Sequence, residues 1–278
     1  MPPPPIRHLT TADTTFRYRE LGAGQPVLLL HGWPTSSFLW RAVMPHLADA
    51  GLRPIALDLP GFGHTLPPAS ASLSFRYYDQ AIDSFLTALG LASTPIDLVV
   101  HDSGGPIGLF WASQHPDRVR RLTLLNTLVY PEMHWTVSAF IAATRIPLMN
   151  QLIASPPAIR QALRFGVHKT RLTRDILDEY AAPFHDSDAR KLILRAGLRL
   201  APAGFVTLSR WLESTQIRVA AIYGERDRLL PDIAKTVTRL AKARPQLEVT
   251  RLPDCAHFLQ EERPAELGRL LAAFHSRV

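Results

Sequence analysis

The residues best suited to chemistry in this sequence occupy one short turn. Asp102 and Ser103 follow the apolar run Ile96 to Val100 and come just before Gly104 and a helical pattern that begins near Pro106. A tight turn from a strand into a helix lifts one side chain above the edge of the sheet and places the helix N-terminal N–H groups beneath it. Glycine lets the helix approach the strand closely. The turn therefore predicts an exposed nucleophile, either a carboxylate or a hydroxyl, at a strand end.

Two registers of this turn are open, with Asp102 or with Ser103 as the nucleophile. Such a turn needs small residues two positions before and two positions after the nucleophile. With Asp102 these positions hold Val100 and Gly104, whereas with Ser103 the first of them holds His101, whose ring would crowd the turn. The pattern favours Asp102. The simpler alternative, in which Asp102 only caps the following helix, is weakened by the residues described next.

An acid and a histidine follow two later strands. Asp227 comes after the apolar run 219–223, and His257 comes after the run 247–252. Taken singly, an Asp after a strand is often a turn former and a His a structural group. A nucleophile, an acid and a histidine at three strand ends, in that order, instead predict a catalytic triad. In this triad His257 is the base and Asp227 orients it.

A rival position for the acid lies at the end of the strand 122–125. Asn126 occupies that position, and its amide carries no charge. Glu132 lies a few residues further on, at the entry to a helical region, and is a weaker candidate. Asp227 is therefore the favoured acid.

Backbone N–H groups near the turn are candidates for an oxyanion hole. The loop His31-Gly32-Trp33-Pro34 follows an apolar strand. The N–H of Trp33 and the N–H of Ser103 would together stabilise a developing oxyanion. The Trp33–Pro34 bond is a candidate cis peptide, because the turn must aim the N–H inward. The indole of Trp33 is compatible with a place in the pocket wall.

The alternation of strands and helices predicts an α/β fold. Buried β-rich runs alternate with helical patterns from the strand at 16–21 to the closing helix near 264–275. This alternation is typical of a parallel sheet with helices on both faces. From 130 to 213 the pattern is purely helical. We therefore expect a catalytic domain of residues 1–129 and 214–278, and an inserted helical cap of residues 130–213 over the strand ends, where such sheets bind ligands.

Composition and charge exclude several classes of function. The net charge of +7 comes largely from arginines at helical spacing among acidic residues in 133–215, which indicates a solvated helix face and no nucleic-acid partner. No apolar run approaches the roughly 20 residues that span a membrane, and no secretory signal is visible. No metal-ligand spacing and no phosphate-binding glycine loop occurs. The single cysteine, Cys255, excludes an internal disulfide and suits a cytoplasmic location.

Four stretches of the sequence resemble the haloalkane dehalogenase and epoxide hydrolase branch of the α/β-hydrolases. The resemblance covers almost the whole predicted catalytic domain and the cap only in outline. It implies a mostly parallel eight-stranded sheet, no cofactor, and a small hydrophobic substrate. It also implies that the Asp102 carboxylate attacks an electrophilic carbon to form an alkyl-enzyme ester, which water activated by His257 then hydrolyses while Asp227 stabilises the imidazolium. The stretches are Gln25–His46, Asp58–Gly63, Val99–Gly108 and Ala256–Glu261.

Two departures from the resemblance bear on the choice between its branches. Haloalkane dehalogenases bind the leaving halide with an indole N–H directly after the nucleophile, where this chain has Ser103, and many add an Asn where this chain has Trp33. Epoxide hydrolases need a cap tyrosine that protonates the ring oxygen, and an aromatic residue in the Trp33 loop is usual for them. Tyr130 and Tyr180 are candidates for this substrate-binding role, unless each only packs a helix. The expected function is therefore an epoxide hydrolase, with haloalkane dehalogenase as the alternative.

Two further classes of function stay open. A serine esterase would use Ser103 as its nucleophile. A non-catalytic ligand receptor on the same scaffold would have no need of Asp102, Asp227 and His257 together, so their joint presence argues against it. The expected assembly is a monomer or a homodimer.

Overall fold

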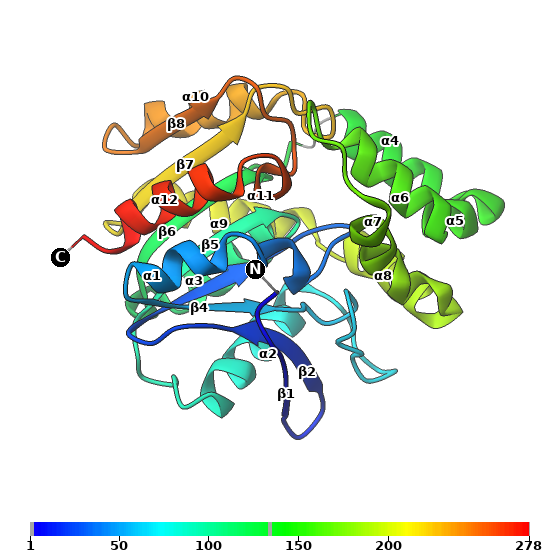
Figure 1. Cartoon of the computed structure of the whole chain (residues 1–278), viewed down its shortest axis with the longest axis horizontal. Helices are drawn as coiled ribbons and strands as arrows, with labels where there is room; N and C mark the ends of the chain where they lie inside the picture. Colours follow the sequence, from blue (N-terminus) through cyan, green and yellow to red (C-terminus); the bar gives the residue numbers. More distant parts are fainter. Residues whose placement is uncertain (1–2, 133–134, 278) are drawn as a thin grey trace.

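An eight-stranded, mostly parallel sheet forms the centre of the molecule and confirms the predicted fold class. The computed structural model describes residues 3–132 and 135–277. The strands lie in the order β1-β2-β4-β3-β5-β6-β7-β8 (Figure 1). The pairs β1–β2 and β2–β4 are antiparallel, and the remaining pairs are parallel. The strands are β1 (Ile6–Thr10), β2 (Thr15–Glu20), β3 (Gln25–Leu30), β4 (Leu52–Leu57), β5 (Ile96–Asp102), β6 (Val119–Thr127), β7 (Arg218–Gly224) and β8 (Glu248–Leu252).

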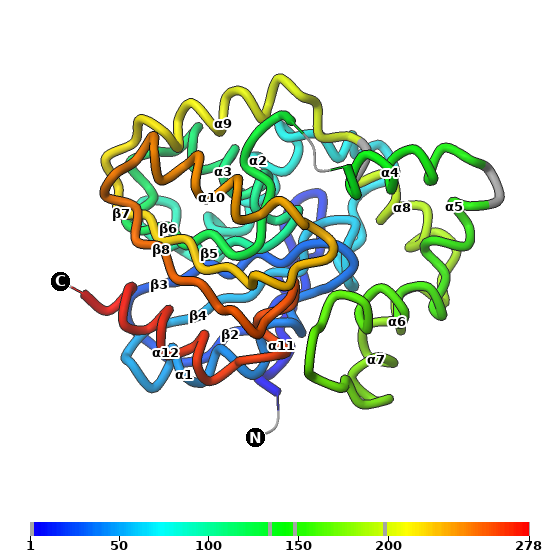
Figure 2. The backbone as a smooth tube through the Cα atoms, turned by 90° about the horizontal axis from the view of Figure 1, so that it is seen from above, coloured from blue at the N-terminus to red at the C-terminus, as the bar shows by residue number. Residues whose placement is uncertain are grey.

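Helices cover both faces of this sheet. On one face α1 packs against α12, and on the other α3 packs between α2 and α9, with α10 beside them (Figure 2). Because such a sheet is buried on both faces, its central strands are apolar without alternation. The helices of these layers are α1 (Met44–Asp49), α2 (Phe75–Ala88), α3 (Gly104–Gln114), α9 (Pro202–Ser214), α10 (Ile233–Ala243), α11 (Leu259–Glu262) and α12 (Pro264–His275).

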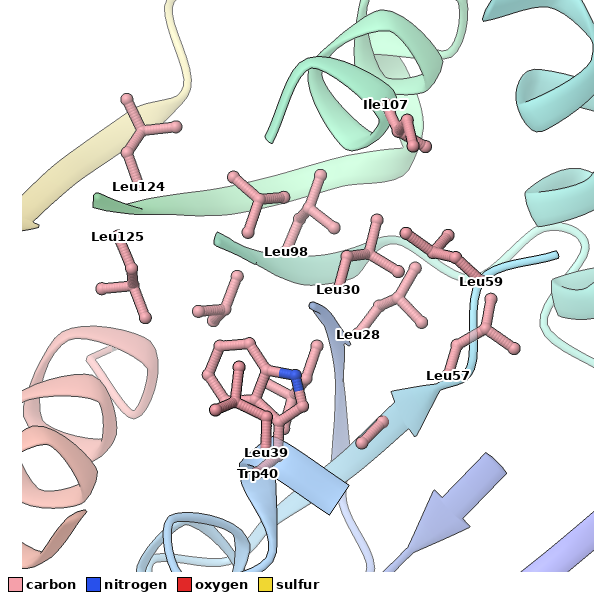
Figure 3. Close-up of a cluster of buried hydrophobic side chains, with 14 of the residues drawn as sticks. Leu28, Leu30, Leu39, Trp40, Leu57, Leu59, Leu98, Ile107, Leu124 and Leu125 are labelled. Carbon is pink, nitrogen blue, oxygen red and sulfur yellow. The ribbon is translucent and has the colours of Figure 1, made fainter. Parts of the chain in front are cut away.

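The core lies against the neighbouring strands β3, β4 and β5. Figure 3 shows the side chains of Leu28, Leu57 and Leu98 in one cluster with Trp40, and each of these four is fully buried. Burying a leucine side chain stabilises a fold by about 1.5–3 kcal/mol. This packed layer gives a rigid base to the loops at the carboxyl ends of the strands.

Five helices of the described residues extend beyond the carboxyl ends of the strands, within the range expected for the cap, and we call them the cap helices (Figures 1 and 2). The ninth helix, which the expected cap range 130–213 includes, packs on α3 in the layer over the sheet. Its Gly204 lies so close to Phe75 that an added Cβ would come within 2.1 Å of the Phe75 ring. The cap helices are α4 (Trp135–Thr144), α5 (Pro147–Ile153), α6 (Pro156–Phe165), α7 (Arg174–Ala181) and α8 (Ser187–Leu198).

The helices of the described residues are shorter than the thickness of a bilayer's apolar core. The sheet-covering helix α2 has 14 residues, and within the described residues no helix is long and apolar enough to cross a membrane. The same residues contain no group of three or more His, Cys, Asp or Glu side chains placed to hold a metal ion.

Candidate active site

Asp102 is the last residue of β5 and stands in a sharp turn into α3. Its φ is +48°, in the left-handed region that side chains other than glycine rarely adopt, and strain of this kind gathers at functional sites. Close packing holds the turn. A Cβ on Gly32 would lie 2.4 Å from Oδ2 of Asp102, and a Cβ on Gly104 would lie 2.1 Å from the His31 carbonyl oxygen. The hydroxyl of Thr127 donates to the Asp102 carbonyl at 2.6 Å. The turn therefore presents the Asp102 carboxylate, as the favoured register predicts.

The loop after β3 brings a backbone donor to this carboxylate. The N–H of Trp33 donates to Oδ2 of Asp102 at 2.7 Å and lies 3.1 Å from Oγ of Ser103. The Trp33–Pro34 peptide is cis, as expected from the sequence. The N–H of Trp33 is thus in place to stabilise negative charge on this carboxylate oxygen.

His257 connects Asp102 to Asp227. Its Nδ1 lies 2.8 Å from Oδ2 of Asp227, which makes Nδ1 the protonated donor. Its Nε2 faces Asp102 with 3.7 Å to Oδ1, beyond hydrogen-bonding length. A base at this separation can act through one water on an ester formed at Asp102. The structure therefore brings the three residues of the predicted triad together.

Asn126 holds the acid in place, a role that the sequence analysis missed. Its Nδ2 donates to Oδ2 of Asp227 at 2.6 Å, and its Oδ1 accepts the N–H of Gly224 at 3.0 Å. The other oxygen of Asp227 accepts the N–H groups of Leu229 and Leu230, both at 2.8 Å. The uncharged amide thus serves the acid instead of replacing it.

Glu132, the other rival for the acid position, points elsewhere. Its carboxylate accepts a hydrogen bond from Arg239 at 3.1 Å, and both side chains are more than half exposed. An exposed ion pair of this kind does not orient a buried histidine.

The surroundings lower the pKa of the acid and raise the pKa of the base. Burial alone would raise the pKa of Asp227, but His257, Asn126 and the N–H of Leu230 outweigh it and lower the pKa to about 2. Burial alone would lower the pKa of His257, but the charge and hydrogen bond of Asp227, with the charge of Asp102, raise that pKa above its ordinary value. Asp227 therefore stays ionised, and His257 readily accepts a proton.

Replacing Asp227 with Asn is expected to shift the pH dependence of the base-catalysed step. His257 must be neutral to take a proton from water, so the rate falls as the pH drops through its raised pKa. Without the Asp227 charge that pKa falls, and the acid limb of the profile moves to lower pH. The maximal rate also falls, by about 10⁴-fold, because the imidazole loses its orienting partner.

The measurement is the pH–rate profile of product release for the wild type, Asp227→Asn and the control Glu132→Gln. Glu132→Gln should match the wild type at every pH. If Asp227→Asn kept nearly full activity and Glu132→Gln were inactive, Glu132 would be the residue that orients His257.

A small apolar cavity of about 150 Å³ opens above Asp102. Among the described residues, Asp102 is the charged residue in the lining of this cavity. The other lining side chains come from both the sheet domain and the cap, chiefly helix α4. Trp33 packs edge-to-face on Phe140 of α4, with 4.8 Å between the ring centroids. Such a cavity accepts a small hydrophobic molecule and desolvates the carboxylate that faces it. The lining residues are Trp33, Asp102, Ser103, Pro106, Leu128, Thr136, Val137, Phe140, Ile141, Leu200, Phe205, Leu229 and Leu230.

The two expected cap tyrosines lie away from this cavity, and among the described residues neither contributes to its lining. Tyr180 is buried, and its hydroxyl donates to Oε1 of Glu261 at 2.5 Å. The ring of Tyr130 lies under the Arg239 guanidinium, 3.6 Å from its centroid. Their placement does not support the expectation that one of them protonates a substrate. Tyr130 precedes α4, and helix periodicity does not tell which face of α7, the helix that carries Tyr180, meets the cavity.

Comparison with known proteins places the chain among hydrolases. A family model described as alpha/beta hydrolase fold matches residues 25–264. A haloalkane dehalogenase of Sphingobium indicum is 29% identical, over 94% of this chain and 92% of the relative. A haloalkane dehalogenase of Agrobacterium fabrum is also 29% identical, over 93% of this chain and 88% of the relative. The crystal structure of haloalkane dehalogenase DatA from Agrobacterium tumefaciens C58 superposes with a TM-score of 0.83 at 26% identity and covers 97% of this chain and 95% of its own.

These similarities correct the order of the two leading functions. The similar proteins are haloalkane dehalogenases, so the comparisons favour the alternative from the sequence analysis over the epoxide hydrolase. The absence of Tyr130 and Tyr180 from the described lining of the cavity agrees with this order.

Proposed function

We propose that this chain, which belongs to the α/β-hydrolase fold family, is an enzyme that replaces the halogen of a small haloalkane with a hydroxyl group. The observation that carries the proposal is the position of the Asp102 carboxylate in an apolar cavity, with Nε2 of His257 3.7 Å from Oδ1. The haloalkane dehalogenases among its relatives support the choice of leaving group. A cytoplasmic monomer or homodimer remains the expectation from the sequence.

In the first step the Asp102 carboxylate attacks the carbon that bears the halogen. A carbon–oxygen bond forms, and the halide leaves with the electron pair of the carbon–halogen bond, which gives an alkyl-enzyme ester. The apolar lining favours this step because it removes water from the attacking carboxylate. The N–H of Trp33, 2.7 Å from Oδ2, marks that oxygen as the future carbonyl oxygen of the ester.

In the second step water hydrolyses the ester. His257 takes a proton from water through Nε2, and the hydroxide attacks Cγ of Asp102. The N–H of Trp33 stabilises the oxyanion, and Asp227 stabilises the imidazolium. Collapse of the intermediate releases the alcohol, which takes up a proton, and restores the carboxylate. One haloalkane and one water thus give one alcohol, one halide and one proton.

The halide needs a donor in the cavity, and we assign this role to the Trp33 indole. Trp33 lines the cavity, and its Nε1 is buried without a hydrogen-bond partner among the described residues. A buried N–H without a partner is costly, and a departing anion would satisfy it. This donor would stand in for the indole that the resemblance to haloalkane dehalogenases implies directly after the nucleophile, where this chain has Ser103.

Trp33→Phe is expected to lower turnover of an alkyl bromide by about 10²-fold, because it removes one donor to the leaving anion. The variant keeps the backbone N–H at position 33, so the ester should still be hydrolysed normally once formed. Rapid-quench measurement of bromide release in a single turnover isolates the affected step. Unchanged bromide release would remove the indole from the mechanism.

The test of the proposed function is a turnover panel of 1-bromobutane, styrene oxide and p-nitrophenyl butyrate on one preparation. We expect equal amounts of butanol and bromide from the first compound. Turnover of styrene oxide without turnover of 1-bromobutane would instead support epoxide hydrolase activity. Cleavage of the p-nitrophenyl ester alone, lost in Ser103→Ala, would make the chain a serine esterase.

A further inference from the structure

The cap meets the catalytic base at one loop. We define the cap loop as residues 166–169, between α6 and α7, and the base loop as residues 253–262, the segment that carries His257 and ends with the short helix α11. The carbonyl of Gly166 accepts the N–H groups of His257 at 2.9 Å and Phe258 at 3.2 Å. A cap carbonyl thus binds the backbone of the catalytic histidine itself.

One partly exposed carboxylate binds both loops. Glu262, at the end of the base loop, accepts the N–H of His168 at 2.7 Å and the N–H of Lys169 at 3.2 Å. Its other oxygen accepts the N–H of Ala256 at 2.6 Å, within the base loop. Hydrogen bonds to an ionised group are stronger than neutral ones. Glu262 therefore holds the residue before His257 and the cap loop in one arrangement.

The close approach of the two loops depends on the missing side chain of Gly166. A Cβ there would lie 2.3 Å from Cε2 of Phe258 and 3.3 Å from Cδ1 of Leu229. The φ of Gly166 is −81°, so the restriction is one of space and not of backbone conformation. The cap loop also reaches the acid, because Arg228, next to Asp227, donates to the Val167 carbonyl at 2.6 Å.

Tyr180 provides a second contact between the cap and the base loop. Its hydroxyl donates to Glu261 at 2.5 Å, and Glu261 forms a two-pronged ion pair with Arg41 at 2.6 and 2.8 Å. Arg41 in turn lies over the Phe38 ring, 4.0 Å from its centroid. This partly buried cluster ties the cap helix α7 to the end of the base loop.

The nucleophile is held in a different way. The carboxylate of Asp102 accepts the N–H of Trp33, its carbonyl accepts the hydroxyl of Thr127, and its backbone pairs with β6, all in the sheet domain. Asp102 therefore keeps its place whether or not the cap loop is seated. His257 receives contacts from both sides, with His101 of the sheet domain donating to its carbonyl at 3.0 Å.

We propose that the cap loop is a positioning device for His257, with Gly166 as its central positioning residue. The proposal rests on the two-step reaction above. The proposal separates the two steps: attack by Asp102 does not depend on the seated cap loop, whereas hydrolysis of the ester does. A cap loop that lifts from the base loop would leave the ester formed and the water unactivated.

Gly166→Ala tests the proposal because the added methyl group pushes the cap loop away from Phe258. Ester formation with 1-bromobutane should stay within a few fold of the wild type, and ester hydrolysis should slow by about 10²-fold, the cost of misplacing a catalytic group by roughly 1 Å. The butyl-enzyme should then accumulate in the steady state, visible by intact mass. Gly268→Ala is the matched control, since its Cβ would lie 2.6 Å from the His46 Cβ, at the α1–α12 contact and outside both the cap loop and the base loop.

The outcomes separate the positioning role from general destabilisation and from the proposed function. Ester accumulation in Gly166→Ala and not in Gly268→Ala, at similar losses of thermal stability, supports the proposal. Equal slowing of attack and hydrolysis in Gly166→Ala contradicts it. If Gly166→Ala does not fold, Tyr180→Phe carries the test, because it removes one hydroxyl donor and should give a smaller accumulation of ester. Absence of any ester in the wild type and in His257→Gln would instead defeat the proposed function.

Discussion

Asp102→Asn is expected to abolish turnover, with a loss on the order of 10⁶-fold, the size seen when the nucleophile of a hydrolytic triad is removed. The amide is a far weaker nucleophile than the carboxylate, and no other carboxylate lines the described cavity. The measurement is butanol release from 1-bromobutane over long incubation. Deamidation of the new side chain would restore the carboxylate, so an intact mass must accompany each assay.

Ser103→Ala is the matched comparison for the nucleophile. It removes the neighbouring hydroxyl and keeps the backbone N–H that the oxyanion hole needs, so its loss should be far smaller. An active Asp102→Asn beside an inactive Ser103→Ala would reverse the register of the turn and make the hydroxyl the nucleophile.

His257→Gln is expected to trap the alkyl-enzyme. Asp102 needs no base to attack, so 1-bromobutane should add one butyl group to each chain. Glutamine cannot take a proton from water, so the ester should persist and turnover should stop after one equivalent of bromide. Intact-mass measurement, followed by peptide mapping to Asp102, checks both points. An unmodified mass in a preparation whose wild type releases bromide would exclude a covalent intermediate on the protein.

The residues of the proposed triad were predictable because each one lies at or after the end of a strand. The runs ending before Asp102, Asp227 and His257 become β5, β7 and β8 of one parallel sheet. Parallel strands bring their carboxyl ends to one edge, so residues far apart in sequence must meet there. The cis Trp33–Pro34 peptide was predictable for the same local reason, since the loop after β3 has to face that edge.

The role of Asn126 could not be inferred from charge. Its amide cannot act as the acid, yet its two polar atoms join Asp227 to the N–H of Gly224. A donor and an acceptor on one short side chain are what such a bridge requires. Its position at the end of β6, the strand next to β7, is the feature of the sequence that points to this role.

The cap was the least predictable part of the chain. Its helices could be placed by periodicity, but the partner of Tyr180 is Glu261, in a segment that only the folded sheet brings near. The same holds for Gly166, whose contact with Phe258 joins an inserted helix region to the last loop of the sheet domain. Contacts between separate segments depend on how elements pack, and helix periodicity carries no such information.

The sequence motifs also could not decide whether the leaving group is a halide or an epoxide oxygen. Ser103 in place of an aromatic donor argued against halide release, whereas the similar proteins are haloalkane dehalogenases. The buried Nε1 of Trp33 resolves this difference in the proposed mechanism, because the donor comes from the loop after β3 instead of from the turn.

The most direct test of the central claim, that Asp102 becomes an ester, is a single turnover of 1-bromobutane by excess wild-type enzyme in heavy-oxygen water. If Asp102 attacks the carbon, the butanol takes its oxygen from the carboxylate and contains ordinary oxygen. The heavy oxygen then enters the side chain when water attacks Cγ, and the peptide that contains Asp102 gains the label. Butanol that carries the heavy oxygen, with an unlabelled Asp102 peptide, would show that water attacks the substrate directly and would contradict the account.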